Sequence, residues 1–191
     1  MANAKPTKSA LIKKKKRWYT VVAPKEMNSI VIGDTPASDI ELLKGRVVNA
    51  NMMTLTNDMK KQNMVATFKI LSAKELTAET EFLGFSITPA HVRRLTKKAK
   101  DKVDDSFKCE TKDGKKIVIK PLIMTRKKLQ RNILSSLRMT ARQLLSQTAK
   151  EMTFMDLIDA VLSNEPQKAL KQSLKKVYPV SMVEIRSLKI E

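Results

Sequence analysis

The sequence is poor in the residues that most often build catalytic and metal centres. Its 191 residues include one cysteine, one histidine and four glycines. Metal sites need several cysteine, histidine or clustered carboxylate ligands, and phosphate-binding loops need several glycines close together. His91 and Cys109 share no nucleophile motif, so we expect a surface position for His91 and a strand position in or near the core for Cys109. We predict no metal, no cofactor and no enzymatic activity.

Long apolar runs and aromatic residues are also scarce. No segment approaches the roughly 18 continuous apolar residues of a membrane span, and no apolar stretch of signal-peptide length follows the N-terminus. A lone cysteine cannot form an internal disulfide, which favours a reducing compartment. We therefore expect a cytoplasmic protein without membrane contact. Aromatic residues make up only 4% of the sequence, so recognition by stacking on bases is disfavoured.

Acidic residues are too few to balance the basic ones. The sequence holds 38 Lys and Arg against 19 Asp and Glu, which leaves a net charge of +19. This excess is far beyond what solubility requires, because small domains are soluble with a few net charges. A polyanionic partner is the simplest explanation for this excess of positive charge, and nucleic acid is the class of partner that the composition favours.

Residues 1–17 form a basic segment with no acidic residue and almost no large apolar side chain. Such a segment cannot bury enough surface to offset its ordering entropy, so we predict an arm that is disordered alone and orders on RNA. A solvated solubility tail or a localisation signal is the alternative interpretation. The candidate RNA contacts at its end are Lys13, Lys14, Lys15, Lys16 and Arg17.

Residues 18–191 are predicted to form a single α+β domain. Short apolar or alternating runs indicate strands at 18–23, 46–54, 64–72, 76–87, 103–110, 115–124 and 180–190. Asp113-Gly114 predicts a tight antiparallel hairpin. Thr88-Pro89 predicts the start of a short inserted helix that runs to about Lys100, and helical spacing predicts three C-terminal helices, the first over about 126–151, the second capped by Thr153 and the third over 165–177. An antiparallel β-barrel-like or curved sheet, with these helices packed on one side, fits this order best.

The stretch from Gly114 to Lys150 holds ten Lys or Arg and no acidic residue. A solvated helix usually mixes charges, because opposite charges four residues apart support it. In a helical projection at about 100° per residue, the basic residues of the predicted helix gather on one face and its apolar residues on the other, and we expect this apolar face to be buried. The basic face comprises Lys127, Lys128, Arg131, Arg138 and Arg142, and the apolar face comprises Leu129, Ile133, Leu137 and Leu144. A merely solvated face is the alternative. The candidate RNA contacts here are Lys115, Lys116, Arg126, Lys127, Lys128, Arg131, Arg138 and Arg142.

A second basic cluster follows Thr88. Its candidate RNA contacts are Arg93, Arg94 and Lys97, and the spacing of Arg93, Lys97 and Lys100 predicts a shared helical side. A solvated short helix is nearly as good an interpretation. Together with the arm and the long helix, this cluster favours a protein held among RNA helices over one that reads a single groove.

An RNA-cleaving or RNA-modifying enzyme is the competing class of function. It would need paired carboxylates or a metal cluster beside the basic surface. Asp104-Asp105 is the only adjacent acidic pair, and neighbouring residues in a strand point to opposite faces. Trp18-Tyr19 could form a stacking platform, but the alternation of this run favours packing in the core or at a sheet edge.

Several motifs, in order along the chain, resemble the small-subunit ribosomal protein family of the S-three-A-e type, which archaea and eukaryotes share. They are Arg17-Trp18-Tyr19 with Ala23-Pro24, Leu43-Lys44-Gly45-Arg46-Val47, Thr111-Lys112-Asp113-Gly114, and Val177-Tyr178-Pro179 with Val183-Glu184-Ile185-Arg186. Residues 32–37 and the length resemble archaeal members.

The resemblance implies a β-barrel-like α+β fold on the platform of the small ribosomal subunit, near the exit of messenger RNA. It implies a structural role in translation, in cytoplasmic ribosomes. The expected partners are small-subunit ribosomal RNA and neighbouring platform proteins, with messenger RNA as a further candidate. A free RNA chaperone or translation regulator is the alternative within the same binding class.

Overall fold

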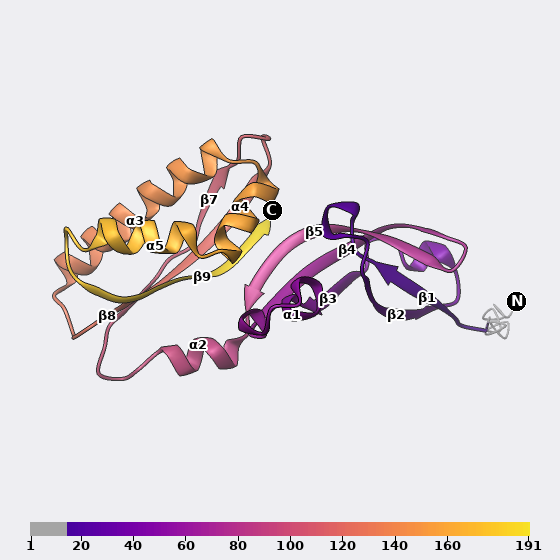
Figure 1. Cartoon of the computed structure of the whole chain (residues 1–191), viewed down its shortest axis with the longest axis horizontal. Helices are drawn as coiled ribbons and strands as arrows, with labels where there is room; N and C mark the ends of the chain where they lie inside the picture. Colours follow the sequence, from indigo (N-terminus) through magenta and orange to yellow (C-terminus); the bar gives the residue numbers. More distant parts are fainter. Residues whose placement is uncertain (1–14) are drawn as a thin grey trace, which may run out of the picture. The chain divides into compact units, whose positions relative to one another are not determined.

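The computed structural model describes residues 15–191, which form two compact units. The first unit comprises the described residues up to Arg46 together with Lys69–Glu81, and the second comprises Val47–Phe68 and Phe82–Glu191. Two long strands contribute residues to both units: β4 (Met64–Lys74) and β5 (Thr77–Ile87). Figure 1 labels the elements along the chain.

The first unit is built around strand β1 (Arg17–Val22). β1 pairs antiparallel with β2 (Val31–Ala37) and parallel with the start of β5. The short 3-10 helices η1 (Lys25–Met27) and η2 (Ile40–Leu42) lie in its connections. Tyr19 is buried, but Trp18 is 66% exposed. The prediction of packing in the core or at a sheet edge therefore holds for Tyr19, whereas most of the Trp18 surface is exposed.

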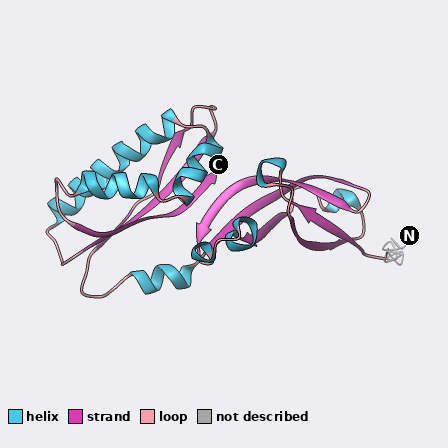
Figure 2. Ribbon diagram, viewed as in Figure 1, coloured by secondary structure: helices cyan, strands magenta, loops and turns pink. Residues whose placement is uncertain are grey.

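The second unit contains a sheet with helices on one face. Its central strand is β9 (Val180–Ile190), which pairs antiparallel with β5 and with β8 (Lys116–Thr125). β6 (Lys102–Asp104) and β7 (Phe107–Glu110) both pair with β8. The remaining elements are β3 (Val47–Asn51), α1 (Met52–Thr56), η3 (Met59–Lys61), α2 (Pro89–Leu95), α3 (Arg131–Glu151), α4 (Phe154–Leu162) and α5 (Glu165–Leu174). Figure 2 shows α3, α4 and α5 on one side of β7, β8 and β9.

The core of the second unit lies between these helices and the sheet. One buried row crosses the adjacent strands β5, β9 and β8 and consists of Phe85, Leu188 and Ile119, which lie side by side on the same face. Phe154 at the start of α4 stacks on Phe82 with ring centres 6.1 Å apart. Burial of apolar area at about 25 cal/mol per Å² is the main stabilising contribution here.

Two local predictions are confirmed by the contacts around the β7–β8 hairpin. Gly114 has a φ of +71°, as the Asp-Gly turn requires, and the two strands pair antiparallel. The Asp113 carboxylate accepts a hydrogen bond of 3.0 Å from the Phe154 N–H, which docks the hairpin onto the start of α4. Thr153 caps α4 as predicted, because its hydroxyl oxygen accepts from the Asp156 N–H.

The α+β class, the inserted helix α2 and the three C-terminal helices are confirmed. The described residues form nine strands in one hydrogen-bonded sheet, whose main order is β2-β1-β5-β9-β8-β6. This sheet is open rather than closed into a barrel, because its end strands β2 and β6 do not pair with each other. No helix among residues 15–191 is long and apolar enough to cross a membrane.

Substitution of Gly84 by alanine should destabilise the protein strongly. Its φ is +141°, and a Cβ atom there would overlap the Leu188 carbonyl oxygen and lie 2.7 Å from the Lys189 Cα atom. Both are backbone atoms of the paired strand β9, so no side-chain rotation relieves the overlap. We expect urea unfolding to show a loss of more than about 4 kcal/mol.

Gly114→Ala is the matched control for this prediction. Its φ of +71° also disfavours a side chain, but a Cβ atom there would have nothing within 4 Å. The backbone strain alone should cost about 1 to 3 kcal/mol. Equal losses for the two variants would contradict the close approach of β5 and β9.

Candidate nucleic-acid interface

Helix α3 carries the centre of the predicted basic surface. Its buried residues Leu137, Ala141, Leu145 and Ala149 recur every fourth position and pack toward the sheet. Leu137 is fully buried, as predicted, whereas Ile133 and Leu144 are only half-buried and Leu145 takes the core position. Arg138 and Arg142 directly follow buried residues, so each is rotated from the buried stripe by about 100°. The arginines therefore lie along one flank of α3 rather than opposite its core.

Lys127 and Lys128 do not belong to α3. The prediction of a helix from about Arg126 is wrong, because the helix begins at Arg131 after the N-cap residue Gln130. Arg126, Lys127 and Lys128 form an exposed turn before it. We refer to these three residues as the basic turn.

A group of polar contacts with Asp101 and Thr125 holds the basic turn in place. The Leu129 N–H donates to the Asp101 carboxylate at 2.7 Å, and the Asp101 N–H donates to the Thr125 hydroxyl oxygen at 3.0 Å. That hydroxyl donates to the Lys127 carbonyl oxygen at 2.7 Å. These contacts engage the Leu129 N–H and the Lys127 carbonyl oxygen and so hold the segment before α3 in place. Asp101, an acidic residue within the basic cluster that follows Thr88, therefore has a structural role: it hydrogen-bonds the segment before α3.

Basic groups accumulate at the positive end of α3. The basic turn and Arg131 surround the helix N-terminus, and the first turn contains no acidic residue. A helix N-terminus carries a partial positive charge, so cations there repel it unless an anion is bound. The Asp101 carboxylate at the Leu129 N–H supplies one negative charge near this end, against the four basic residues, so a bound polyanion would stabilise the helix further.

The arginines of α3 are not neutralised within the part of the chain that the structure describes. Ion pairs among residues 15–191 join Lys74 to Glu79, Lys108 to Glu191 and Arg186 to Asp104, and none involves α3 or the basic turn. Arg142 lies with its guanidinium carbon 5.6 Å from the centre of the Phe107 ring. This contact fixes Arg142 and leaves its N–H groups able to bind phosphate oxygens.

Lys115 and Lys116 lie at the opposite end of α3. The Lys112 N–H donates to the Met152 carbonyl oxygen at 3.1 Å, which fastens the hairpin beside the C-terminal end of the helix. The Lys115 ammonium lies 5.4 Å from the centre of the Phe154 ring, and both lysines are exposed. A helix of 21 residues spans about 30 Å, so the basic groups at its two ends could contact well-separated phosphates.

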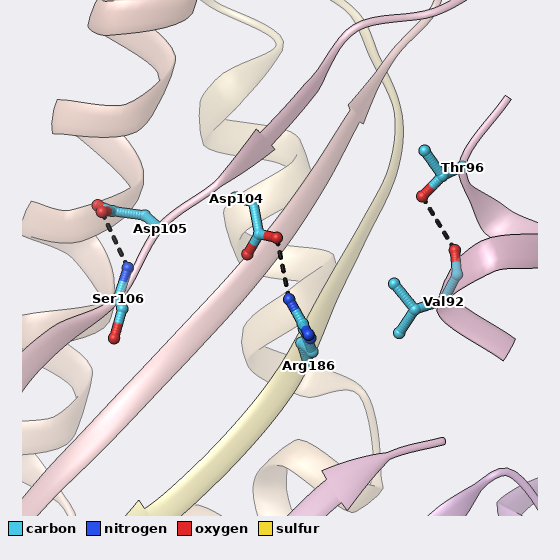
Figure 3. A network of polar contacts seen from close by, with 6 residues as sticks. All are labelled: Val92, Thr96, Asp104, Asp105, Ser106 and Arg186. Atoms are coloured by element: carbon cyan, nitrogen blue, oxygen red, sulfur yellow. Dashed lines mark hydrogen bonds and ion pairs between the residues drawn. The ribbon is translucent and has the colours of Figure 1, made fainter. Parts of the chain in front are cut away.

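The basic cluster around α2 is less uniform than predicted. α2 ends at Leu95, because the extended residue Thr96 closes the helix with its hydroxyl on the Val92 carbonyl oxygen (Figure 3). The shared helical side predicted for Arg93, Lys97 and Lys100 is therefore wrong, and Lys97 lies in the following turn. Arg94 donates to the Asn63 side-chain oxygen at 2.9 Å. Among the three predicted contacts, Arg94 thus has a structural role.

The basic arm is described only at its end. Lys13 and Lys14 lie outside the described residues, whereas Lys15, Lys16 and Arg17 are exposed. Arg17 begins strand β1 and pairs with Ala37. These cations belong to the first unit, and the basic turn, α2, α3 and the hairpin belong to the second.

Burial shifts the pKa values of three described residues that could serve in a catalytic site, namely His91, Cys109 and Glu184. Burial and the charge of Arg94 lower the pKa of His91, and burial raises the pKa of the Cys109 thiol, so the thiolate that a nucleophile needs is disfavoured. Burial also raises the pKa of Glu184. No group of three potential metal ligands occurs within residues 15–191.

The acidic pair Asp104-Asp105 is divided between two separate contacts. Asp104 binds Arg186 across the sheet at 3.0 Å, and the Asp105 carboxylate accepts a hydrogen bond from the Ser106 N–H (Figure 3). The two carboxylates therefore do not form a paired centre. Arg186, like Asp101, was not recognised from the sequence, because its partner is distant along the chain.

A basic helix whose arginines form no ion pair with a described acidic residue, on an open α+β sheet, favours a binding protein over a catalyst. Comparison with known families gives the particular group: the chain belongs to the Ribosomal S3Ae family, whose model matches residues 8–191. This finding confirms the S-three-A-e resemblance seen in the sequence motifs.

Curated relatives extend over nearly the whole chain, and the three described here are all named small ribosomal subunit protein eS1. The relative from Nanoarchaeum equitans is 32% identical over 93% of this chain and 90% of its own length. Those from Haloarcula marismortui and Methanothermobacter thermautotrophicus are 34% and 33% identical, over 92% and 90% of this chain and 83% and 88% of their own lengths. These relatives are named as ribosomal proteins and not as enzymes, which supports the prediction that the chain is not an enzyme.

Replacement of Asp101 by alanine should destabilise the second unit. The change leaves the Leu129 N–H without its acceptor, and loss of a partly buried hydrogen bond costs about 1 to 3 kcal/mol. Chemical unfolding of Asp101→Ala measures this loss. Asp101→Asn keeps a side-chain oxygen in the same place and should cost less. If the two variants were equally destabilised, the hydrogen bond would not be what holds the basic turn.

Proposed function

We propose that the chain is a structural constituent of the small ribosomal subunit that binds ribosomal RNA and thereby supports translation. The relatives' shared name supports the ribosomal role. The observation that best supports RNA binding is the row of exposed arginines on α3. None of these arginines forms an ion pair with a described acidic residue.

The chemistry of these side chains suits the RNA backbone. The planar guanidinium group donates two parallel hydrogen bonds to phosphate oxygens, a geometry that lysine lacks. Each phosphate contact also releases condensed counterions, so binding weakens as the salt concentration rises. The basic turn, the hairpin lysines and Arg93 would add further phosphate contacts around α3. Recognition would then depend on the shape and position of the RNA rather than on its bases.

The location within the subunit follows from the family resemblance alone. We infer a place on the platform near the exit of messenger RNA, with neighbouring platform proteins as partners and messenger RNA as a candidate contact. In this account the basic residues of the segment 1–17, most of which lies outside the described residues, also contact ribosomal RNA, and residues 18–191 act as one RNA-bound domain.

Neutralising the arginines of α3 should weaken RNA binding without unfolding the protein. In the triple variant Arg131→Gln, Arg138→Gln, Arg142→Gln, each exposed change should cost about 0.5 kcal/mol of stability or less, with about 0.5 to 1 more for the Phe107 contact of Arg142. The slope of log affinity against log salt for small-subunit ribosomal RNA should shrink by roughly 0.7 to 0.9 per lost contact, or about two in total. Binding titrations at several salt concentrations measure the slope.

The matched control removes three positive charges from α5 and the turn after it. Lys168→Gln, Lys175→Gln, Lys176→Gln changes exposed residues of the same unit by the same net charge. This variant should keep a slope closer to that of the wild type. Wild-type incorporation of the arginine variant into small subunits, with an unchanged salt slope, would show that this flank is only solvated surface.

A further inference from the structure

The face of the sheet opposite α3–α5 contains a second cluster of basic residues. A hollow of about 500 Å³ lies on strands β5, β8 and β9, beside the start of α2. Its polar lining consists of Ser86, Lys120, Arg186, Ser187 and Lys189. None of these residues is among the predicted RNA contacts, and all belong to the second unit.

The strand register explains why these side chains gather. Ser86 on β5, Ser187 on β9 and Lys120 on β8 are direct neighbours across the sheet. In the next row of the same face, Lys189 lies between Gly84 and Val118. The residues between these two rows, including Leu188, are buried on the helix side. Because side chains alternate along a strand, the serines and lysines must face away from α3–α5.

Arg186 is held at this hollow by its contact with Asp104. A register shift occurs in β9 where Lys120 pairs with Ser187 and Pro121 pairs with Ile185, so Arg186 has no direct partner on β8. Its guanidinium donates one hydrogen bond of 3.0 Å to Asp104 and has further N–H donors. Asp104 offsets the charge of Arg186, whereas no ion pair among residues 15–191 involves Lys120 or Lys189.

We propose that this hollow binds the phosphate and ribose of one nucleotide in an RNA strand. This proposal rests on the proposed function, because it assumes that RNA is the partner. Two ammonium groups, a guanidinium edge and two hydroxyl groups supply donors for phosphate oxygens and the 2′-hydroxyl. The apolar lining, which includes Pro89 and Val118, suits the ribose. A hollow of this size is within the range of small-ligand sites.

A consequence of this site is that the second unit contacts RNA on two faces. The α3 flank lies on the helix side of the sheet, and the hollow lies on the other side. A protein with cations on both faces of one sheet can contact RNA segments that lie on opposite sides of it.

Amine reactivity of the wild-type protein tests the site without any substitution. The full chain is treated with an acetylating reagent, free and bound to protein-free small-subunit ribosomal RNA, and acetylation is quantified by mass spectrometry. Lys120 and Lys189 should become several-fold less reactive with RNA, whereas Lys168 and Lys175 on the α5 side should change little. Equal reactivity of Lys120 and Lys189 in the two states overturns the proposal. Protection that occurs only in the assembled particle also overturns it, because the surface would then contact a protein.

A double variant that removes both positive charges separates this site from the α3 surface. Lys120→Gln, Lys189→Gln should reduce the salt slope by about 1.5 relative to the wild type, at roughly 0.7 to 0.9 per contact. Lys120→Arg, Lys189→Arg should retain the wild-type slope. Hydroxyl-radical footprinting should show that the glutamine variant loses protection at nucleotides different from those lost by the α3 variant.

The two hypotheses fail in different ways. If the wild-type chain did not bind small-subunit ribosomal RNA, the proposed function would fail first. If the α3 variant weakened binding but the Lys120, Lys189 variant did not, only the second site would be wrong.

Discussion

The pairing of β9 with both β5 and β8 is the interaction on which the second unit depends. This last strand of the chain lies between two earlier ones, so the sheet is complete only when residues 180–190 have joined it. Its inner residues, such as Leu188 and Ile185, belong to the buried apolar face against which the C-terminal helices pack. Its outer residues Arg186 and Lys189 place basic groups on the other face. The close approach at Gly84 shows how little space the β5–β9 pairing leaves.

Repulsion among like charges is the second constraint on the molecule. With a net charge of +19, the chain cannot neutralise its cations internally, and the ion pairs among the described residues leave the α3 arginines unopposed. The fold places these cations on the flank of α3, on the basic turn and on the outer sheet face, while apolar residues occupy the core. Bound RNA would remove the repulsion, so the charge that opposes folding in isolation would favour assembly.

The parts of the structure that depend on neighbouring residues were predictable from the sequence. The Asp113-Gly114 turn, the Thr153 cap and the burial of Leu137 follow from local chemistry and helical spacing. The failures involve residues distant in the chain. The position of the basic turn before α3 involves contacts with Asp101, and the outer-face cluster depends on the register between β8 and β9, neither of which composition or periodicity reveals. The parallel pairing of β1 with β5 likewise joins segments with no sequence signal in common.

The central claim is that this chain is a stable component of the small ribosomal subunit and is held there by RNA. Sedimentation of a native cell lysate through a sucrose gradient, with the chain detected by a specific antibody, tests it most directly. The account predicts that the chain sediments with the small subunit and moves to the top of the gradient after ribonuclease digestion. A chain that remains in the top fractions of an undigested lysate would contradict it.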